Sequence, residues 1–596
     1  MTQSEDRATS AAADDDPKEE FVMVEMKQAE ETPKAAWNGP VQQPDVIMNW
    51  KNVLAYLGLL GCMFLAAIDN TIVATALPDI TSEFKAADLY SWVIVAYLLT
   101  STAVTPIVGR LAMIFGRKKL IMVSVVVFLI SSAICGAAVD IYMLIIFRAV
   151  QGIGGGVILS GGMVLISDWF PINQRAKYGA FIGLCFSVAN VVGPVVGGAF
   201  SLNVSWRWVF YINLPSGGLS LATIFFFLNY EADRANNASS VNASWNQAAG
   251  SSQQTITQKL RTLDYGGMVL ILVAVTCLVL GVSLGGNQYP WRSAPVIVLL
   301  VACGPLFILL VWYEMKIAKN PVLSFEVFLR KAVSLSSLGI FLLGAVVTGL
   351  INYMPVYFQI IRGDNPIISG VKLIPILLFS IVPTVASGRV IGTYGYAYPW
   401  PIAGFVFTSL SGGLLTTISA GTSYPAIGFF LALIGIGLGC IIQVMFFVAQ
   451  GHVEPKEIPM VSALVTFFRT LGGVAGVTIF QTIITNTLTS DLKDDFLVQS
   501  VNKGYDFIKT NLTVEQQDAV YTAYLHGMHL VFWAATAMSL LGLFIVVWIP
   551  RQRLPCEVTR REAEEKRKAA EGNGEKGGES DLEMKAETKG LKGDEE

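Results

Sequence analysis

The sequence predicts an all-α polytopic membrane protein with two six-helix bundles and two inserted central helices, about 14 transmembrane helices in total. First, 53% of the 596 residues are hydrophobic and 14% are charged, with a mean hydropathy of +0.56, whereas soluble proteins average about 25% charged residues. Second, the apolar runs are roughly 20 residues long, which is enough for a helix to cross the hydrocarbon layer. Third, a short motif recurs in the two halves of the chain.

The predicted spans fill most of the chain between two polar tails. They cover residues 52–77, 90–110, 120–139, 141–165, 177–199, 208–229, 264–284, 294–315, 334–358, 367–387, 401–419, 425–449, 460–486 and 529–549. Both tails are expected to be disordered because they are polar and highly charged, and the first carries no cleavable signal pattern. The resulting parts are an N-terminal tail (1–48), an N-terminal bundle (49–229), a cytoplasmic linker (230–263), two inserted helices (264–315), a C-terminal bundle (316–550) with an external loop (487–528), and a C-terminal tail (551–596).

The orientation follows from the short loops, because lysine and arginine concentrate on the cytoplasmic side of membrane proteins. Alternate loops carry most of these residues, which predicts that both termini are cytoplasmic. Asn511 begins an Asn-Leu-Thr sequon in the predicted external loop and is therefore the expected glycosylation site. The sequons at Asn237 and Asn242 lie in a predicted cytoplasmic connection and are expected to stay unmodified.

The internal repeat relates span two to span ten. The segments 109–116 and 388–395 both read G-R-[LV]-x-x-x-[FY]-G. Spans five and thirteen also correspond, since both are rich in glycine. Two six-span halves separated by an inserted pair, spans seven and eight, account for this register.

Span four carries an arginine and a glutamine inside apolar sequence. The pattern is Leu144-x-x-x-Arg148-x-x-Gln151, followed by a glycine-rich run, 152–156. Arg148 and Gln151 lie about one turn apart on the same helix face, which predicts that this face points away from lipid. The glycine run lies inside a span and lacks the spacing of a phosphate loop, so we expect it to serve helix packing.

Span five contains Gly193-Pro194-Val195-Val196-Gly197-Gly198. The proline removes a backbone donor, and the glycines allow a neighbouring helix to approach closely. This pattern predicts a packed and bent span.

Asp69 is the clearest candidate for a proton carrier, because carboxylates are scarce in the spans and desolvation favours the neutral form of a carboxyl group. Counting from the predicted span ends places Asp69 about 12 Å and Arg148 about 10 Å below the outer surface. The hypothesis is that Arg148, with Gln151, holds or releases Asp69 according to its proton. The alternative is a permanently ionised Asp69 with a fixed partner, and an Arg148 that only ties helices together.

Polar and aromatic side chains within the spans are candidates to line a substrate cavity. The alternative is helix bridging for the neutral polar groups, packing or interfacial anchoring for the aromatic residues, and snorkelling to an interface for Arg469. The candidates are Asn190, Asn352, Tyr353, Phe358, Gln443 and Arg469.

Residues 50–550 resemble the major facilitator superfamily, in its branch of fourteen-span drug:proton antiporters, and are most similar to fungal multidrug and mycotoxin efflux pumps. The matching segments are 65–74 and 76–78 in span one, the loop 109–120, the arginine motif at Arg148, the antiporter motif Gly193-Pro194-x-x-Gly197-Gly198, and the run 206–215. The resemblance implies a gating role for Gly109, Arg110, Gly116, Arg117 and Lys118. The usual acidic residue of this gating loop is replaced by Met113, and the following basic position by Ile114.

The predicted function is proton-coupled efflux of small hydrophobic organic compounds by alternating access between the halves. No catalytic residues, metal site, cofactor or nucleic-acid partner is expected, and the partners are a small-molecule substrate, protons and the lipid bilayer. A monomer in the plasma membrane is expected, with a vacuolar or vesicular membrane as the alternative. The rival functions are a siderophore:proton symporter of the same fold, against which the glycine-proline run of span five counts, and a transport-incompetent sensor, against which the low-complexity tails count.

Overall fold

The chain divides into two units, Met1–Gln42 and Gln43–Glu596. A computed structural model describes residues 49–84, 90–170, 172–228, 264–285, 289–318, 325–454, 457–492, 494, 497, 505–551 and 554, all in the second unit. The predicted N-terminal tail and the predicted linker 230–263 lie outside the described residues, as does nearly all of the C-terminal tail.

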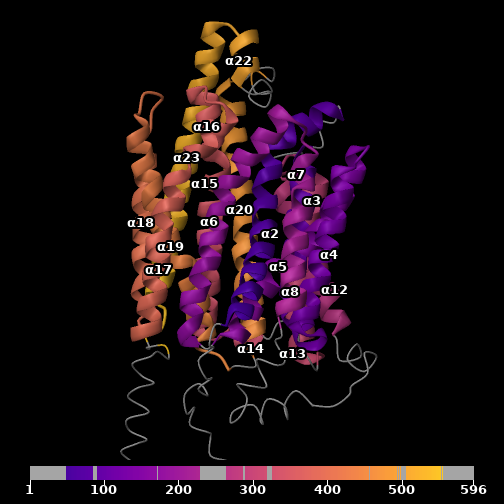
Figure 1. Ribbon diagram of the computed structural model, residues 1–596. Coiled ribbons are helices and arrows are strands. Elements are labelled where there is room, and N and C mark those ends of the chain that lie inside the picture. The colour runs from indigo at the N-terminus through magenta and orange to yellow at the C-terminus, as the bar shows by residue number, and fades with distance from the viewer. Residues whose placement is uncertain are drawn as a thin grey trace, which may run out of the picture. The chain divides into compact units, whose positions relative to one another are not determined.

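The regular elements of the described residues are helices. Figure 1 shows the long helices running side by side along one common direction. The first group is α2 (Trp50–Glu83), α3 (Tyr90–Phe115), α4 (Arg117–Gly136), α5 (Ile141–Trp169), α6 (Ile172–Asn203), α7 (Trp208–Tyr211) and α8 (Asn213–Phe227). Next come α12 (Tyr265–Leu284) and α13 (Ala294–Lys316). The last group is α14 (Phe325–Phe328), α15 (Lys331–Arg362), α16 (Pro366–Val371), α17 (Ile374–Tyr394), α18 (Pro399–Leu415), α19 (Tyr424–Gln450), α20 (Ile458–Leu492), α22 (Tyr505–Asn511) and α23 (Val514–Val547).

Within the described ranges, 12 helices are long and apolar enough to cross a membrane. The protein is therefore a multi-pass membrane protein. The helices α6 and α18 coincide with two more predicted spans, but they are not among these 12. The number of fourteen spans stays a prediction.

One predicted segment differs from the observed helices. The predicted sixth and tenth spans are confirmed as helices long and apolar enough to cross a membrane, Trp208–Phe227 and Ile368–Tyr394, and the residues between α7 and α8 and between α16 and α17 keep helical dihedral angles. The predicted external loop 487–528 is largely helical where it is described, because α20 continues to Leu492, α22 follows, and α23 already begins at Val514. Thr513 caps α23 with a reciprocal capping box, which stabilises a polar helix start that hydropathy does not detect.

The two halves repeat the same packing scheme. In the first half α2 packs on α6 and α3 on α5, and in the second half α15 packs on α20 and α17 on α19. The halves meet through the corresponding pairs, α3 with α20 and α17 with α6. The last glycine of each repeated motif, Gly116 and Gly395, has a positive φ, of 86° and 77°, a conformation that glycine adopts without strain. The predicted correspondence of spans two and ten, and of five and thirteen, therefore agrees with the helix packing.

The inserted helices pack beside the contact between α3 of the first half and α20 of the second half. The helix α12 contacts α13, α3 and α20. One apolar cluster joins Ile107 of α3, Ile271 and Val275 of α12, Leu310 of α13 and Phe467 of α20. Burial of these side chains holds the pair to both halves.

Candidate functional site

Asp69, Arg148 and Gln151 meet in the interior of the first half. Their side chains are 0%, 1% and 0% exposed. Arg148 Nη1 lies 2.5 Å from Asp69 Oδ2 and donates to Gln151 Oε1 at 3.0 Å, while Gln151 Nε2 donates to Asp69 Oδ1 at 3.0 Å. The predicted closeness of Asp69 and Arg148 is thus confirmed. The ion pair is fully buried, so neither charge is screened by water.

Asn213 completes the environment of Asp69 and was not recognised from the sequence. Its Nδ2 donates to Asp69 Oδ1 at 3.1 Å and contacts Ser132 Oγ at 3.0 Å. Asn213 is the first residue of α8, and Ile212, which lies between α7 and α8, has helical dihedral angles. A buried asparagine within the apolar run 206–215 was the available signal, since a polar side chain at such a position needs partners.

Arg148 has partners besides the carboxylate. Its Nε donates to the carbonyl of Val93 at 3.3 Å, and its guanidinium lies 4.5 Å from the ring centre of Tyr97 and 5.8 Å from that of Phe210. These contacts come from α3 and α7. The guanidinium is therefore held in place by groups that carry no charge, so its position does not depend on the ion pair alone.

The glycine run of α5 allows this arrangement. A Cβ on Gly152 would lie 2.4 Å from the carbonyl oxygen of Tyr97, and a Cβ on Gly156 would lie 2.5 Å from that of Ser101. Both distances are too short for any side chain, so α5 approaches the backbone of α3 only because these positions are glycine. The predicted role of the run in helix packing is confirmed.

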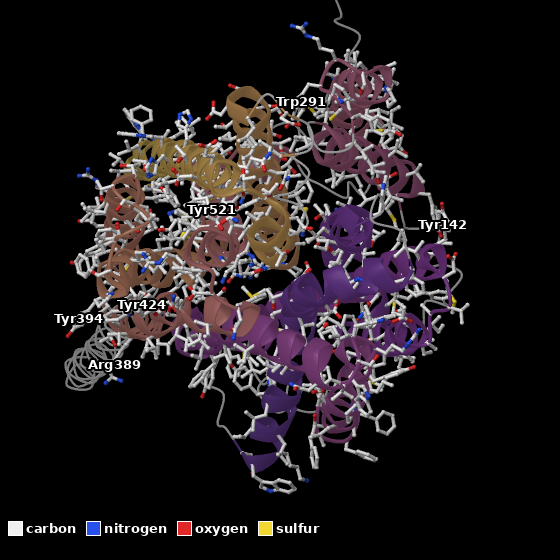
Figure 2. All side chains as sticks on the ribbon, turned by 90° about the horizontal axis from the view of Figure 1, so that it is seen from above. Tyr142, Trp291, Arg389, Tyr394, Tyr424 and Tyr521 are labelled. Atoms are coloured by element: carbon white, nitrogen blue, oxygen red, sulfur yellow. The ribbon has the colours of Figure 1, made fainter. Side chains whose placement is uncertain are left out.

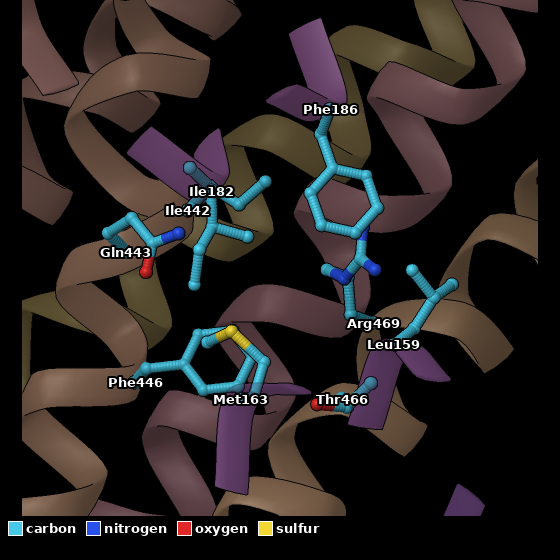
Figure 3. A pocket seen from close by; sticks show the side chains of 9 residues that line it. All are labelled: Leu159, Met163, Ile182, Phe186, Ile442, Gln443, Phe446, Thr466 and Arg469. Carbon is cyan, nitrogen blue, oxygen red and sulfur yellow. The ribbon is translucent and has the colours of Figure 1, made fainter. Parts of the chain in front are cut away.

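A small cavity lies between the halves, lined from α5, α6, α19 and α20 (Figure 3). Its volume is about 10 Å³, which is space for about one water molecule. Two of the predicted cavity residues, Gln443 and Arg469, line it. The remaining lining residues are Leu159, Met163, Ile182, Phe186, Ile442, Phe446 and Thr466.

Three further predicted cavity residues, Asn352, Tyr353 and Phe358, are not among the residues that line this cavity. Asn352 is exposed and donates to the carbonyl of Thr348 at 2.8 Å. Tyr353 donates to the side chain of Gln481, and Phe358 is buried, with Lys372 Nζ 5.2 Å from its ring centre. The side chain of Asn190 lies outside what the structure describes.

The predicted gating residues occupy the junction of α3 and α4. A Cβ on Gly109 would lie 2.9 Å from the carbonyl oxygen of Pro459, so α3 meets the start of α20 closely here. Gly116 separates the two helices, and Arg117 begins α4. Lys118 Nζ donates to the carbonyl of Phe225 in α8 at 2.9 Å, so this lysine contacts its own half.

Arg110 interacts electrostatically with acidic residues of the inserted helices. The carboxylates of Glu314 on α13 and Asp264 at the start of α12 both act on its guanidinium. Asp264 also caps α12 and accepts a hydrogen bond from Tyr313 at 2.9 Å. The residue of the second repeat that corresponds to Arg110 is Arg389, which is exposed at the edge of the protein seen from above (Figure 2). The inserted helices therefore supply acidic groups near the predicted gating loop, in which Met113 replaces the usual carboxylate.

The antiporter motif lies in α6. A Cβ on Gly193 would lie 2.0 Å from Thr71 Oγ1 of α2, so α6 packs tightly against the helix that carries Asp69. Gly197 and Gly198 are buried. The side chain of Pro194 lies outside the described part, and the predicted bend stays a prediction.

Asn511, the predicted glycosylation site, is the exposed last residue of α22. Thr513 of the same sequon caps α23.

Two similar helical halves with a cavity between them, and a buried ion pair inside the first half, form the architecture of a multi-pass membrane transporter. Residues 59–477 match the profile of the Major Facilitator Superfamily, and the chain belongs to this family. It is 31% identical over 492 residues to the MFS-type efflux pump MFS1 of Trichophyton rubrum, covering 82% of this chain and 89% of the relative. It is 32% identical over 510 residues to the efflux pump FUS6 of Gibberella moniliformis, covering 83% and 87%.

The fold is also similar to that of a solved structure, the MFS proton:xylose symporter XylE. The TM-score is 0.54 at 15% sequence identity, covering 84% of this chain and 96% of that chain. The similarity supports the fold assignment.

Proposed function

We propose that the protein exports small, mostly apolar organic compounds from the cytoplasm in exchange for protons, by alternating access, as a monomer in the plasma membrane. Relatives that align over more than four-fifths of the chain are named efflux pumps, which supports the export direction. The observation that carries the proposal is the fully buried network of Asp69, Arg148, Gln151 and Asn213.

Asp69 is the proton carrier in this proposal. In its ionised form it accepts hydrogen bonds from the side chains of Arg148, Gln151 and Asn213, and its charge balances that of Arg148. A proton on Asp69 removes the ionic attraction between α2 and α5, while Arg148 keeps its bonds to Val93 and Gln151. The tie between the two helices therefore weakens without releasing the guanidinium.

The helix α5 connects the network to the cavity. Leu159 lines the cavity and lies 11 residues after Arg148, about 16 Å along the helix axis. The same helix contacts α20 of the second half. A change in how α5 is held against α2 is therefore transmitted as a rigid-body shift to the cavity and to the contact between the halves.

The size of the cavity supports alternating access. A drug-sized compound needs a site of about 300 to 1,000 Å³, and this cavity holds about 10 Å³. Entry of a substrate requires the helices around the cavity to separate. In the proposal the described conformation is a closed state between inward and outward opening.

The test is transport into inside-out vesicles under an imposed inside-acid gradient, with a fluorescent lipophilic cation and, separately, candidate secondary metabolites. Wild type is compared with Asp69→Asn, which keeps the shape of the side chain and removes its charge. Asp140→Asn is the matched control, because Asp140 is exposed and only caps α5, a role that asparagine also fills.

We expect gradient-driven accumulation in wild type and in the control, and none in Asp69→Asn. Accumulation that survives Asp69→Asn would place the coupling elsewhere. Uptake in the opposite direction would favour a symporter, and no transport of any compound would contradict export.

A further inference from the structure

Arg469 is a partly buried cation of the cavity without an anionic partner among the described residues. It lies on α20, within the membrane-spanning part of the second half. Its guanidinium makes no hydrogen bond or ion pair with the described part of the chain, and lies 4.6 Å from the ring centre of Phe186 on α6 (Figure 3). Arg148 in the first half, by contrast, has Asp69 as its counter-charge.

An unpaired guanidinium at this depth is energetically costly. The face of one aromatic ring offsets only part of that cost. A guanidinium has five N–H donors in a planar fork that fits carboxylate-like groups. The guanidinium of Arg469 therefore needs an anionic acceptor, and the described residues do not supply one.

The opposite wall contains a second unsatisfied group. Gln443 on α19 is 3% exposed, and its Oε1 has no hydrogen-bond partner among the described residues. Buried polar atoms are nearly always paired. Both unsatisfied groups line the same cavity, while Phe186, Phe446 and Met163 line it with apolar surface.

We propose that the substrates are organic anions with an aromatic or apolar body. The anionic group binds Arg469, the body packs on Phe186, Phe446 and Met163, and a hydroxyl or amide N–H of the substrate donates to Gln443. This inference rests on the proposed export function, because it assigns a substrate class to the same cavity.

The test uses three probes with one ring system and permanent or absent charge: naphthalene-2-sulfonate, naphthalene-2-sulfonamide and (2-naphthylmethyl)trimethylammonium. Binding to the purified full-length protein in lipid nanodiscs is measured by equilibrium dialysis. A charge-assisted bond to the guanidinium predicts that wild type binds the sulfonate about tenfold or more tightly than the other two probes. Permanent charges prevent the pH gradient from redistributing the probes by itself in the transport assay.

Three variants separate charge at the cavity from charge elsewhere. Arg469→Gln is expected to reduce the preference for the sulfonate to about threefold or less, and Arg469→Lys to retain most of it. Lys316→Gln removes one exposed positive charge from α13 and is expected to bind as wild type does. Melting curves without probe verify that each variant is folded, and the preference of the wild type among the three probes keeps the proposal falsifiable if Arg469→Gln does not fold.

Equal binding of the three probes to wild type, or no binding of any of them, overturns the anion site. A preference that persists in Arg469→Gln, or that is lost in Arg469→Lys and in Lys316→Gln alike, also overturns it. Export itself is tested separately with the same probes in the vesicle assay. Sulfonate binding that depends on Arg469, without gradient-driven transport, would leave the anion site standing and contradict export.

Discussion

Removing one member of the buried pair is expected to harm folding more than removing both. Arg148→Leu leaves the carboxylate of Asp69 in the interior with only the donors of Gln151 and Asn213, both on Oδ1. Asp69→Leu leaves the guanidinium of Arg148 with two neutral acceptors and no counter-charge. The double variant Asp69→Leu/Arg148→Leu contains neither buried charge.

The magnitude follows from the burial of both groups, 0% and 1% exposed. Breaking a buried ion pair by removing one partner costs about 3 to 5 kcal/mol, whereas replacing both partners with apolar side chains is often neutral. We therefore expect each single variant to lose about 3 to 5 kcal/mol of unfolding free energy. The double variant should be at least as stable as the less stable single variant, with a coupling energy of about 2 kcal/mol or more.

The protein contains its own reporter for this measurement. Cys62 and Cys135 are free and buried, 1% and 0% exposed, so a thiol-reactive fluorophore labels them as the helices separate on heating. The four melting midpoints form a double-mutant cycle. Strictly additive losses, with the double variant melting below both singles, would refute the ion-pair energetics. All three variants should be inactive in gradient-driven transport.

Three further predictions follow from packing, charge and topology. Gly476→Ala should lower the free energy of unfolding by about 1 to 3 kcal/mol, because a Cβ there would lie 2.0 Å from a main-chain oxygen of α15. The control is Gly413→Ala, whose Cβ would have nothing within 4 Å, and it should leave the melting midpoint unchanged or raise it. Asp264→Asn should keep the cap of α12 and the melting midpoint but lower the transport rate, because one of the two carboxylate charges acting on Arg110 is lost while Glu314 remains. An unchanged rate would exclude the charge of Asp264 from gating. Asn511→Gln should remove the mobility shift caused by endoglycosidase treatment, and a wild-type chain without that shift would contradict the external position of α22.

Depth within a span could be predicted from the sequence, because a helix rises by a constant distance per residue. Asp69 and Arg148 were placed in one layer on that basis, and they form an ion pair. The repeat at 109–116 and 388–395 likewise identified which helices correspond. The reason is that each motif ends in a glycine whose positive φ few other residues adopt.

Helix rotation could not be predicted. Tyr353 and Phe358 were candidates because they are aromatic side chains within a span, but residue type does not say which helix face points toward the cavity. Tyr353 bonds to Gln481 and Phe358 is buried, and neither lines the described cavity. Asn213 reaches Asp69 because it lies on the face of α8 that points into the first half, and hydropathy does not report which face of a helix a residue occupies. The C-terminal end of α20 and the N-terminal end of α23 were missed because hydropathy reports the lipid-embedded part of a helix alone.

The position of the inserted helices has a consequence for lipophilic compounds that dissolve in the bilayer. The helix α12 packs on α3 and α20 together, through Ile107, Ile271 and Phe467 among others. The helix α12 thereby covers the lipid-facing side of the contact between α3 and α20, and the turn between α12 and α13 at Trp291 lies at the outer rim in Figure 2. In the proposed transport cycle, a compound that diffuses within a leaflet would meet α12 on this side, and a lateral entry route would have to open away from α12.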